Sequence, residues 1–109
     1  MSSDKLNLAS GHASQNPYDD GPLFPMGQVV ASPGALDVCA ANNISPTQLI
    51  ARHRCGDWGD TCDADSAANE QALFEGGRIF SVYIFEGEKL YCITEADRSS
   101  TALIRAEDY

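Results

Sequence analysis

Basic residues are scarce in this chain, and their scarcity limits what the protein can bind. Seven Lys and Arg residues stand against sixteen Asp and Glu residues among 109, which gives a formal net charge of −9. A surface of this sign repels phosphate backbones at long range. Non-specific nucleic-acid binding is therefore disfavoured, whereas a basic protein partner, a small-molecule substrate or simple solubility fits the charge.

Long apolar runs and Cys-x-x-Cys pairs are also missing. No stretch approaches the roughly 20 residues that cross a bilayer, so we expect no membrane partner. The N-terminus lacks the apolar run of a secretory signal, and the four cysteines then indicate free thiols in a cytoplasmic protein. A zinc site at His53, Cys55 and Cys62 would not match the common ligand spacings. The sequence therefore predicts no metal and no cofactor.

The polar N-terminal segment differs from the rest of the chain. Residues 1–25 carry few apolar side chains and no periodicity, which predicts a disordered tail. Residues 26–109 hold enough apolar side chains for one modest core. We therefore expect a tail followed by a single folded domain.

Two Ser-Pro pairs, at residues 32–33 and 45–46, predict helix starts. Serine caps the first turn, and proline at that position loses no hydrogen bond. Gln48 stands three residues after the second serine and completes a capping box. At helical spacing, the first helix would turn Leu36, Cys39 and Ala40 inward and the second would place His53 on its apolar face.

A third helix is expected from Asp63 or Asp65 to Glu75, where a glycine pair ends it. The last third of the chain is rich in β-branched and aromatic residues, which favour strands. The expected strands are residues 28–31, 78–85, 89–94 and 101–105. The predicted fold class is α+β: one short strand, two to three helices, then a three-stranded antiparallel meander with the helices packed on one face.

Polar residues on the second helix and in the loop after it could carry chemistry. His53 is either a buried histidine hydrogen-bonded in the core or a general acid or base, because only histidine titrates near neutrality unaided. Trp58, with Asp57 and two glycines beside it, belongs either to the core at a tight turn or to a stacking platform at the edge of a pocket. We keep both interpretations for each.

The link between the last two expected strands is dense in charged and hydroxyl residues. It is either a solvated turn with a local ion pair between Arg98 and the acidic residues Glu95 and Asp97, or a binding site at the end of a sheet. In a site, the planar guanidinium of Arg98 would hold an oxyanion or phosphate. Ser99 and Thr101 could donate hydrogen bonds to the same group.

Three segments together resemble a family of small uncharacterised proteins carried on plasmids and integrative elements of proteobacteria. The segments are residues 29–36, residues 51–53 followed by 56–59, and residues 93–101, and the resemblance extends over about 26–109. It implies a mobile element as the source and implies no mechanism. A more distant similarity, at the level of the fold, is to the barnase–EndoU–colicin–RelE group of small ribonuclease toxins, which are typically basic.

Two functions follow as hypotheses. In the enzyme, His53 is the general acid or base, Arg78 and Arg98 stabilise a phosphate, and Ser99 or Thr101 orients it. The substrate is then RNA, cleaved by its ribose 2′-OH, or a small anionic ligand. In the alternative, the protein is a non-enzymatic acidic inhibitor that mimics nucleic acid on a basic host protein. A small-molecule binding module is a third possibility.

Overall fold

Four strands form one mixed sheet in the structure, a computed structural model that describes residues 22–109. The elements in chain order are β1 (Gln28–Ala31), α1 (Pro33–Ala41), α2 (Pro46–Arg54), α3 (Asp63–Glu75), β2 (Ile79–Phe85), β3 (Glu88–Thr94), β4 (Ser100–Arg105) and the 3₁₀ turn η3 (Ala106–Asp108). The predicted α+β class is confirmed, and only η3 was not expected.

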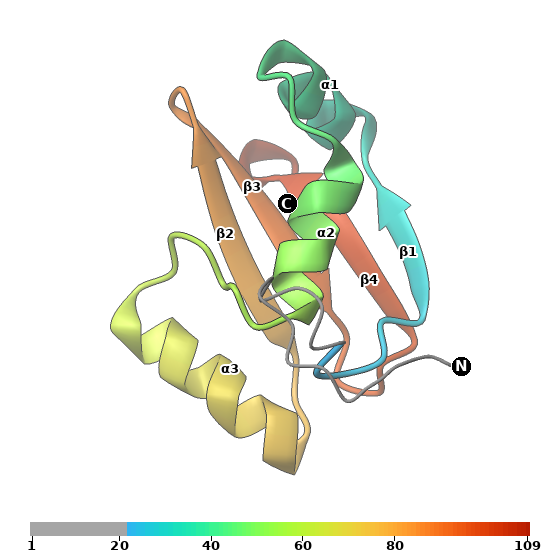
Figure 1. The fold of residues 1–109 in the computed structure, drawn as a ribbon, viewed down its shortest axis with the longest axis vertical. Helices are drawn as coiled ribbons and strands as arrows, with labels where there is room; N and C mark the ends of the chain where they lie inside the picture. The colour runs from blue at the N-terminus through green and yellow to red at the C-terminus, as the bar shows by residue number, and fades with distance from the viewer. Residues whose placement is uncertain (1–21) are drawn as a thin grey trace, which may run out of the picture.

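The sheet has the order β1-β4-β3-β2, so the first strand of the chain lies at one edge. Strands β2, β3 and β4 form the predicted antiparallel meander, and β1 pairs with β4 in parallel. Helices α1 and α2 lie over one face of the sheet, whereas α3 lies beside the opposite edge strand, β2 (Figure 1). This arrangement directs the side chains of α2 onto the middle of the sheet.

The helix starts follow the predicted capping pattern. The Ser32 hydroxyl accepts a hydrogen bond from the backbone N–H of Ala35 at 3.1 Å. The side-chain oxygen of Gln48 accepts from the backbone N–H of Ser45 at 3.0 Å. Each bond satisfies a donor that the helix itself cannot pair. Among the described residues, no helix combines the length and the apolar character that crossing a membrane requires.

The prediction for the inner face of α1 was right for Cys39 and wrong for Leu36 and Ala40, which are exposed. Leu36 is 46% exposed, whereas Ala35, Val38 and Cys39 face the core. Both sets have the i, i+3, i+4 spacing of one helix face, so periodicity alone could not separate them. Their neighbours in the core come from α2 and the sheet: Leu49, Ile50, Tyr83, Leu90, Cys92 and Leu103.

The packed part of the chain begins earlier than predicted. Residues 22–25 were assigned to the tail, yet Phe24 is buried and the backbone N–H of Leu23 donates to the carbonyl of Arg54 at 2.8 Å. Phe24 joins Trp58 and other side chains in a second, smaller core cluster. The remainder of the predicted tail, residues 1–21, lies outside the described residues.

The edge of β2 is covered by side chains and by a loop. Asn69 of α3 accepts from the backbone N–H of Phe80 at 2.9 Å and donates to its carbonyl at 2.8 Å. The loop at residues 58–60 bonds to the backbone of Val82 and accepts from the N–H of Ile84 at 3.0 Å. This strand therefore presents few free backbone groups to another chain.

Candidate functional site

A chain of buried hydrogen bonds crosses the sheet beneath α2. The ring of His53 is 0% exposed, with Nδ1 2.6 Å from the Ser81 hydroxyl and Nε2 2.9 Å from the Thr94 hydroxyl. The Thr94 hydroxyl lies 2.6 Å from that of Thr101, which donates to the carbonyl of Met26 at 2.9 Å. We call His53, Ser81, Thr94 and Thr101 the buried network.

The last hydrogen bond of this series, from Thr101 to the carbonyl of Met26, determines which nitrogen of the His53 ring carries the proton. Because the Thr101 hydroxyl donates to a carbonyl, its oxygen accepts from Thr94. The Thr94 oxygen then accepts from Nε2–H of His53, and the Ser81 hydroxyl donates to Nδ1. A neutral imidazole therefore satisfies every hydroxyl of the buried network, and no polar atom of the ring is left over.

Burial also keeps the ring neutral. Desolvation lowers the pKa of His53 from 6.5 to about 4, because the charged form would lose its hydration. A general acid or base has to come within hydrogen-bond reach of its substrate. Among residues 22–109, the hydrogen-bond partners of the His53 ring are the buried hydroxyls of Ser81 and Thr94.

Two aromatic rings complete the enclosure of His53. Phe24 meets it edge to face at 5.3 Å between ring centroids, and Trp58 does so at 6.0 Å. The indole N–H of Trp58 donates to the carboxylate of Glu70 on α3 at 2.9 Å, and Trp58 is only 6% exposed. Of its two interpretations, the structure therefore favours the core residue over the stacking platform.

Arg98 lies near the buried network, but its donors bind the backbone. Its guanidinium donates to the carbonyls of Gly77 at 2.6 Å, Ala72 at 3.0 Å and Glu95 at 3.1 Å. It also lies over the ring of Phe24, 5.7 Å from the centroid. Arg98 thus joins the turn between β3 and β4 to the C-terminal end of α3, where carbonyls lack helical partners.

Arg78 has different neighbours from those of Arg98. Its guanidinium lies 3.5 Å from the carboxylate of Glu95, and both side chains are about half exposed. A hydrogen bond with Tyr109 raises the pKa of Arg78 above its ordinary value. The contacts of Arg78 thus belong to the surface, whereas those of Arg98 extend toward the interior.

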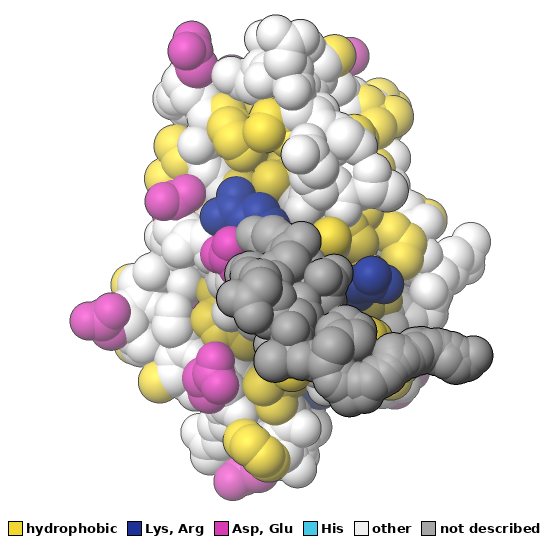
Figure 2. Space-filling view, in the orientation of Figure 1, with side chains coloured by type: hydrophobic (Ala, Val, Ile, Leu, Met, Phe, Trp, Pro, Cys, Tyr) yellow, Lys and Arg dark blue, Asp and Glu magenta, His cyan; other side chains and the backbone are white. Residues whose placement is uncertain are grey.

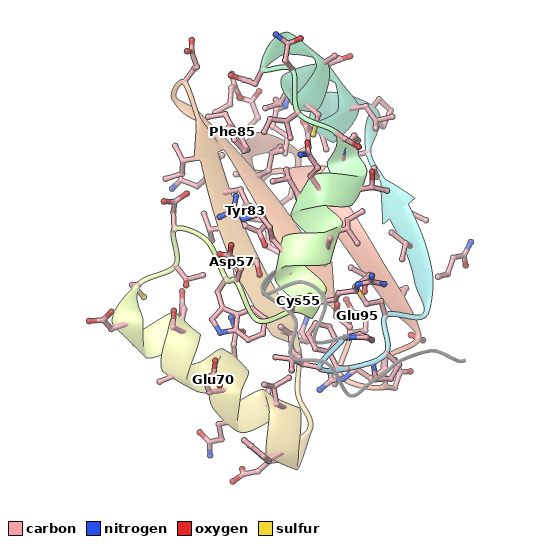
Figure 3. The ribbon with its side chains drawn as sticks, in the orientation of Figure 1. Cys55, Asp57, Glu70, Tyr83, Phe85 and Glu95 are labelled. Atoms are coloured by element: carbon pink, nitrogen blue, oxygen red, sulfur yellow. The ribbon has the colours of Figure 1, made fainter. Side chains whose placement is uncertain are left out.

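The remaining predicted site residues stabilise turns. The Asp97 carboxylate accepts from the N–H of Ser99 at 2.9 Å, and hydrogen bonds from Ser99 lower the pKa of Asp97. Asp57 forms an ion pair with Arg52 at 2.8 Å, and its carbonyl accepts from the Tyr83 hydroxyl at 2.7 Å (Figure 3). The structure thus brings His53, Thr101 and Arg98 to one region, and leaves Arg78, Asp97 and Ser99 on its outside.

Three residues of this region were not predicted. Phe24 stood in a short apolar run within the polar tail, which is the one local indication of its burial. Ser81 and Thr94 occupy inward positions of β2 and β3, since Ser81 lies between the buried residues Ile79 and Tyr83. Strand alternation would have placed these hydroxyls in the core, where they require a partner.

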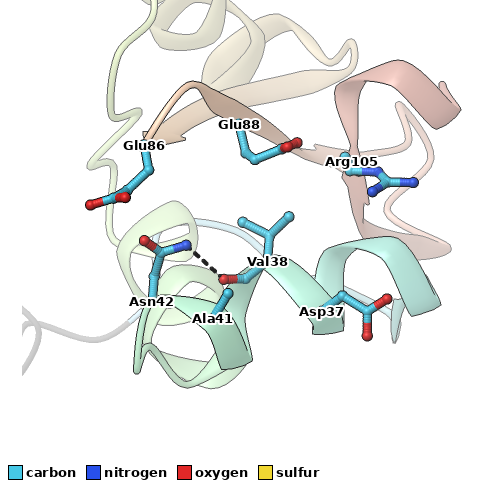
Figure 4. A pocket seen from close by; sticks show the side chains of 7 residues that line it. All are labelled: Asp37, Val38, Ala41, Asn42, Glu86, Glu88 and Arg105. Atoms are coloured by element: carbon cyan, nitrogen blue, oxygen red, sulfur yellow. Dashed lines mark hydrogen bonds between the residues drawn. The ribbon is translucent and has the colours of Figure 1, made fainter.

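Two surface cavities of the described residues lie elsewhere. One of about 290 Å³ is lined by α1 and the β2–β3 turn (Figure 4), and one of about 320 Å³ is lined by α3 and the start of β2. Arg78 lines the second cavity, but His53, Arg98 and Thr101 line neither. Within residues 22–109, no three His, Cys, Asp or Glu side chains are grouped to hold a metal ion, and the four cysteines are free thiols.

Comparison with known proteins found no match for this chain. No protein-family model matches the chain, and no curated protein or solved structure matches it. The resemblance to proteins of mobile elements stays a prediction. The function of this chain is therefore argued from its own residues.

Proposed function

We propose that the protein is a non-enzymatic acidic interaction protein that binds a basic surface on a protein partner. One observation carries the proposal: His53 has no exposed surface, and both of its ring nitrogens are hydrogen-bonded inside the molecule. The residue best suited to acid–base chemistry therefore supports the fold.

The ribonuclease hypothesis needs more than this geometry provides. Its mechanism requires a histidine that reaches the ribose and arginines that reach the phosphate. The ring of His53 is enclosed, and its pKa is lowered to about 4 by burial. The Arg98 guanidinium already donates to backbone carbonyls. Catalysis by these residues would require the core to open.

The charge supports the binding hypothesis. Residues 55–77 contain six acidic residues and no Lys or Arg. Figure 2 shows acidic side chains spread over one face of the molecule, with few basic ones among them. Such a surface attracts a cationic partner and accelerates the encounter at low salt. A protein surface that binds phosphate backbones has the required charge, and this chain would occupy it as a mimic of nucleic acid.

The test combines binding and cleavage. An oligolysine peptide and a helical peptide with Lys and Leu at helical spacing, called here the Lys/Leu peptide, serve as basic probes. We expect both to bind the protein at low ionic strength and to bind it much more weakly at about 0.15 M salt. We also expect no hydrolysis of RNA beyond that of the His53→Gln variant.

Two results would overturn the proposal. The first is that neither peptide binds the protein at low salt. The second is RNA hydrolysis by the wild-type protein that His53→Gln abolishes, because that result would show His53 to be catalytic. The Gln side chain can still accept and donate hydrogen bonds within the buried network, so the comparison separates chemistry from folding.

A further inference from the structure

We infer that the outer side of α3 is the surface that docks the partner, with Phe74 as its apolar anchor in a cationic groove. The inference rests on the proposed function and adds which surface is used and what chemistry it meets. It comes from three properties of one helix: an exposed aromatic ring, charge of a single sign, and attachments that leave this ring uncovered.

Phe74 is the most exposed large apolar side chain of the described residues, at 87%. It lies on the same side of α3 as Ala67 and Gln71, at the i, i+4, i+7 spacing that marks one helix stripe. Both of these residues are exposed as well. Ala67 is small and Gln71 is polar, so Phe74 is the one large apolar side chain of this stripe, and a single exposed ring of this kind can anchor a helix in an apolar groove.

The charge of α3 determines the chemistry of the groove. The helix carries Asp63, Asp65, Glu70 and Glu75 and no basic residue. A partner that buries Phe74 must bring its own surface close to these carboxylates. A surface with Lys or Arg around an apolar pocket does so with charge attraction, whereas an acidic surface would be repelled. Figure 2 shows acidic and hydrophobic side chains together over α3.

The inner side of α3 holds the helix in place. Asn69 bonds to the backbone of Phe80, and the carbonyl of Ala72 accepts from Arg98. The exposed Glu70, four residues before Phe74, also accepts from Trp58. Only Asn69 and Ala72 of its 13 residues are buried. The fold thus fixes the helix through a few contacts and leaves Phe74 outside, already positioned for binding.

A second copy of this chain fits the surface less well than a basic partner. Two copies would place acidic helices against an acidic protein of net charge −9, and like charges in contact are repulsive. Nucleic acid is disfavoured for the same reason. The inference therefore commits to a basic protein groove, and self-association is an outcome of the test.

The experiment titrates the isotope-labelled full chain with the Lys/Leu peptide and follows its amide NMR resonances. We expect the largest shifts along α3 and a loss of affinity on the order of tenfold or more in Phe74→Ala, as for other aromatic anchors. The matched control is Leu36→Ala, which shortens an exposed apolar side chain of α1. This control should bind like the wild type.

The outcomes separate the inference from the proposed function. Phe74→Ala should keep the wild-type circular dichroism spectrum, because its ring has little packing to lose. If it also keeps the wild-type affinity, or if the shifts avoid α3, the inference is overturned and the proposed function stands. Dimerisation that Phe74→Ala abolishes would overturn it in favour of a second copy. If neither basic peptide binds the wild type, both proposals fail.

Discussion

Helices α2 and α3 use polar residues in opposite ways. Helix α2 turns His53 into the molecule, where every polar atom of the ring is paired. Helix α3 turns its carboxylates and Phe74 toward solvent. The residue best suited to acid–base chemistry is thus enclosed, whereas a helix that carries no histidine or cysteine is accessible. In this protein, residue type alone is a poor guide to which side chains are accessible to a partner or substrate.

The difference has a physical origin in desolvation. A polar group in the interior costs free energy unless each of its hydrogen bonds is replaced. Ser81 and Thr94 provide the replacements for His53, and Thr101 pairs with Thr94, so the four residues depend on one another. Side chains on the outer side of α3 keep their water, and the hydrogen bond from Gln71 to Glu75 among them is exposed.

His53→Ala should lower the free energy of unfolding by about 4 kcal/mol. The substitution leaves a cavity and removes the partner of the Ser81 and Thr94 hydroxyls. Urea denaturation of both proteins measures the difference. Gln71→Ala on the exposed side of α3 is the control, and it should change stability by less than about 0.5 kcal/mol. Equal losses in the two variants would contradict the contrast between the helices.

The free energy of unfolding should decrease as the pH is lowered, because His53 has different pKa values in the folded and the unfolded protein. Its pKa is lowered to about 4 in the folded protein and is about 6.5 in the unfolded chain. The unfolded state therefore binds more protons below pH 6.5. Stabilisation is complete above that pH and is lost as the pH falls toward 4, by on the order of 3 kcal/mol.

Urea denaturation at a series of pH values measures this loss, and His53→Gln is the control. Carboxylates titrate near the acid end of the range in both proteins, so the informative interval is pH 6.5 to 5. There the wild type should lose stability while His53→Gln stays nearly constant. A parallel slope in the two proteins would show that another group is responsible.

The fold could be predicted largely because its determinants are local. Ser32 and Gln48 cap helices within three residues, and strand composition located the meander. The rotation of α1 could not be predicted, because Leu36 and Ala35 each belong to a regular helical stripe. That choice is made by the packing against the sheet, which has no counterpart in local sequence.

The candidate site was harder to predict from the sequence than the fold, because the residues in contact there are distant along the chain. His53 bonds to residues 28 and 41 positions away, so its partners Ser81 and Thr94 depend on the register between helix and sheet. The sequence was compatible with two interpretations of His53, as a buried core residue or as a catalytic residue, and the structure favours the first. Arg98 shows the same limit, since its acceptors at the end of α3 are brought close only by the fold.

Asn69→Ala should lower the free energy of unfolding by a smaller amount, about 2 kcal/mol. The variant also tests whether the inner and outer sides of α3 have different roles. Asn69 makes two hydrogen bonds to the backbone of Phe80, but that edge is only partly buried, so water can replace part of what is lost. Hydrogen exchange of the Phe80 amide reports the change directly. It should accelerate in Asn69→Ala and stay unchanged in Gln71→Ala, because only the inner side of the helix contacts the strand. If exchange were unchanged in both variants, α3 would not hold the edge of β2, and its outer side would have no fixed position from which to bind a partner.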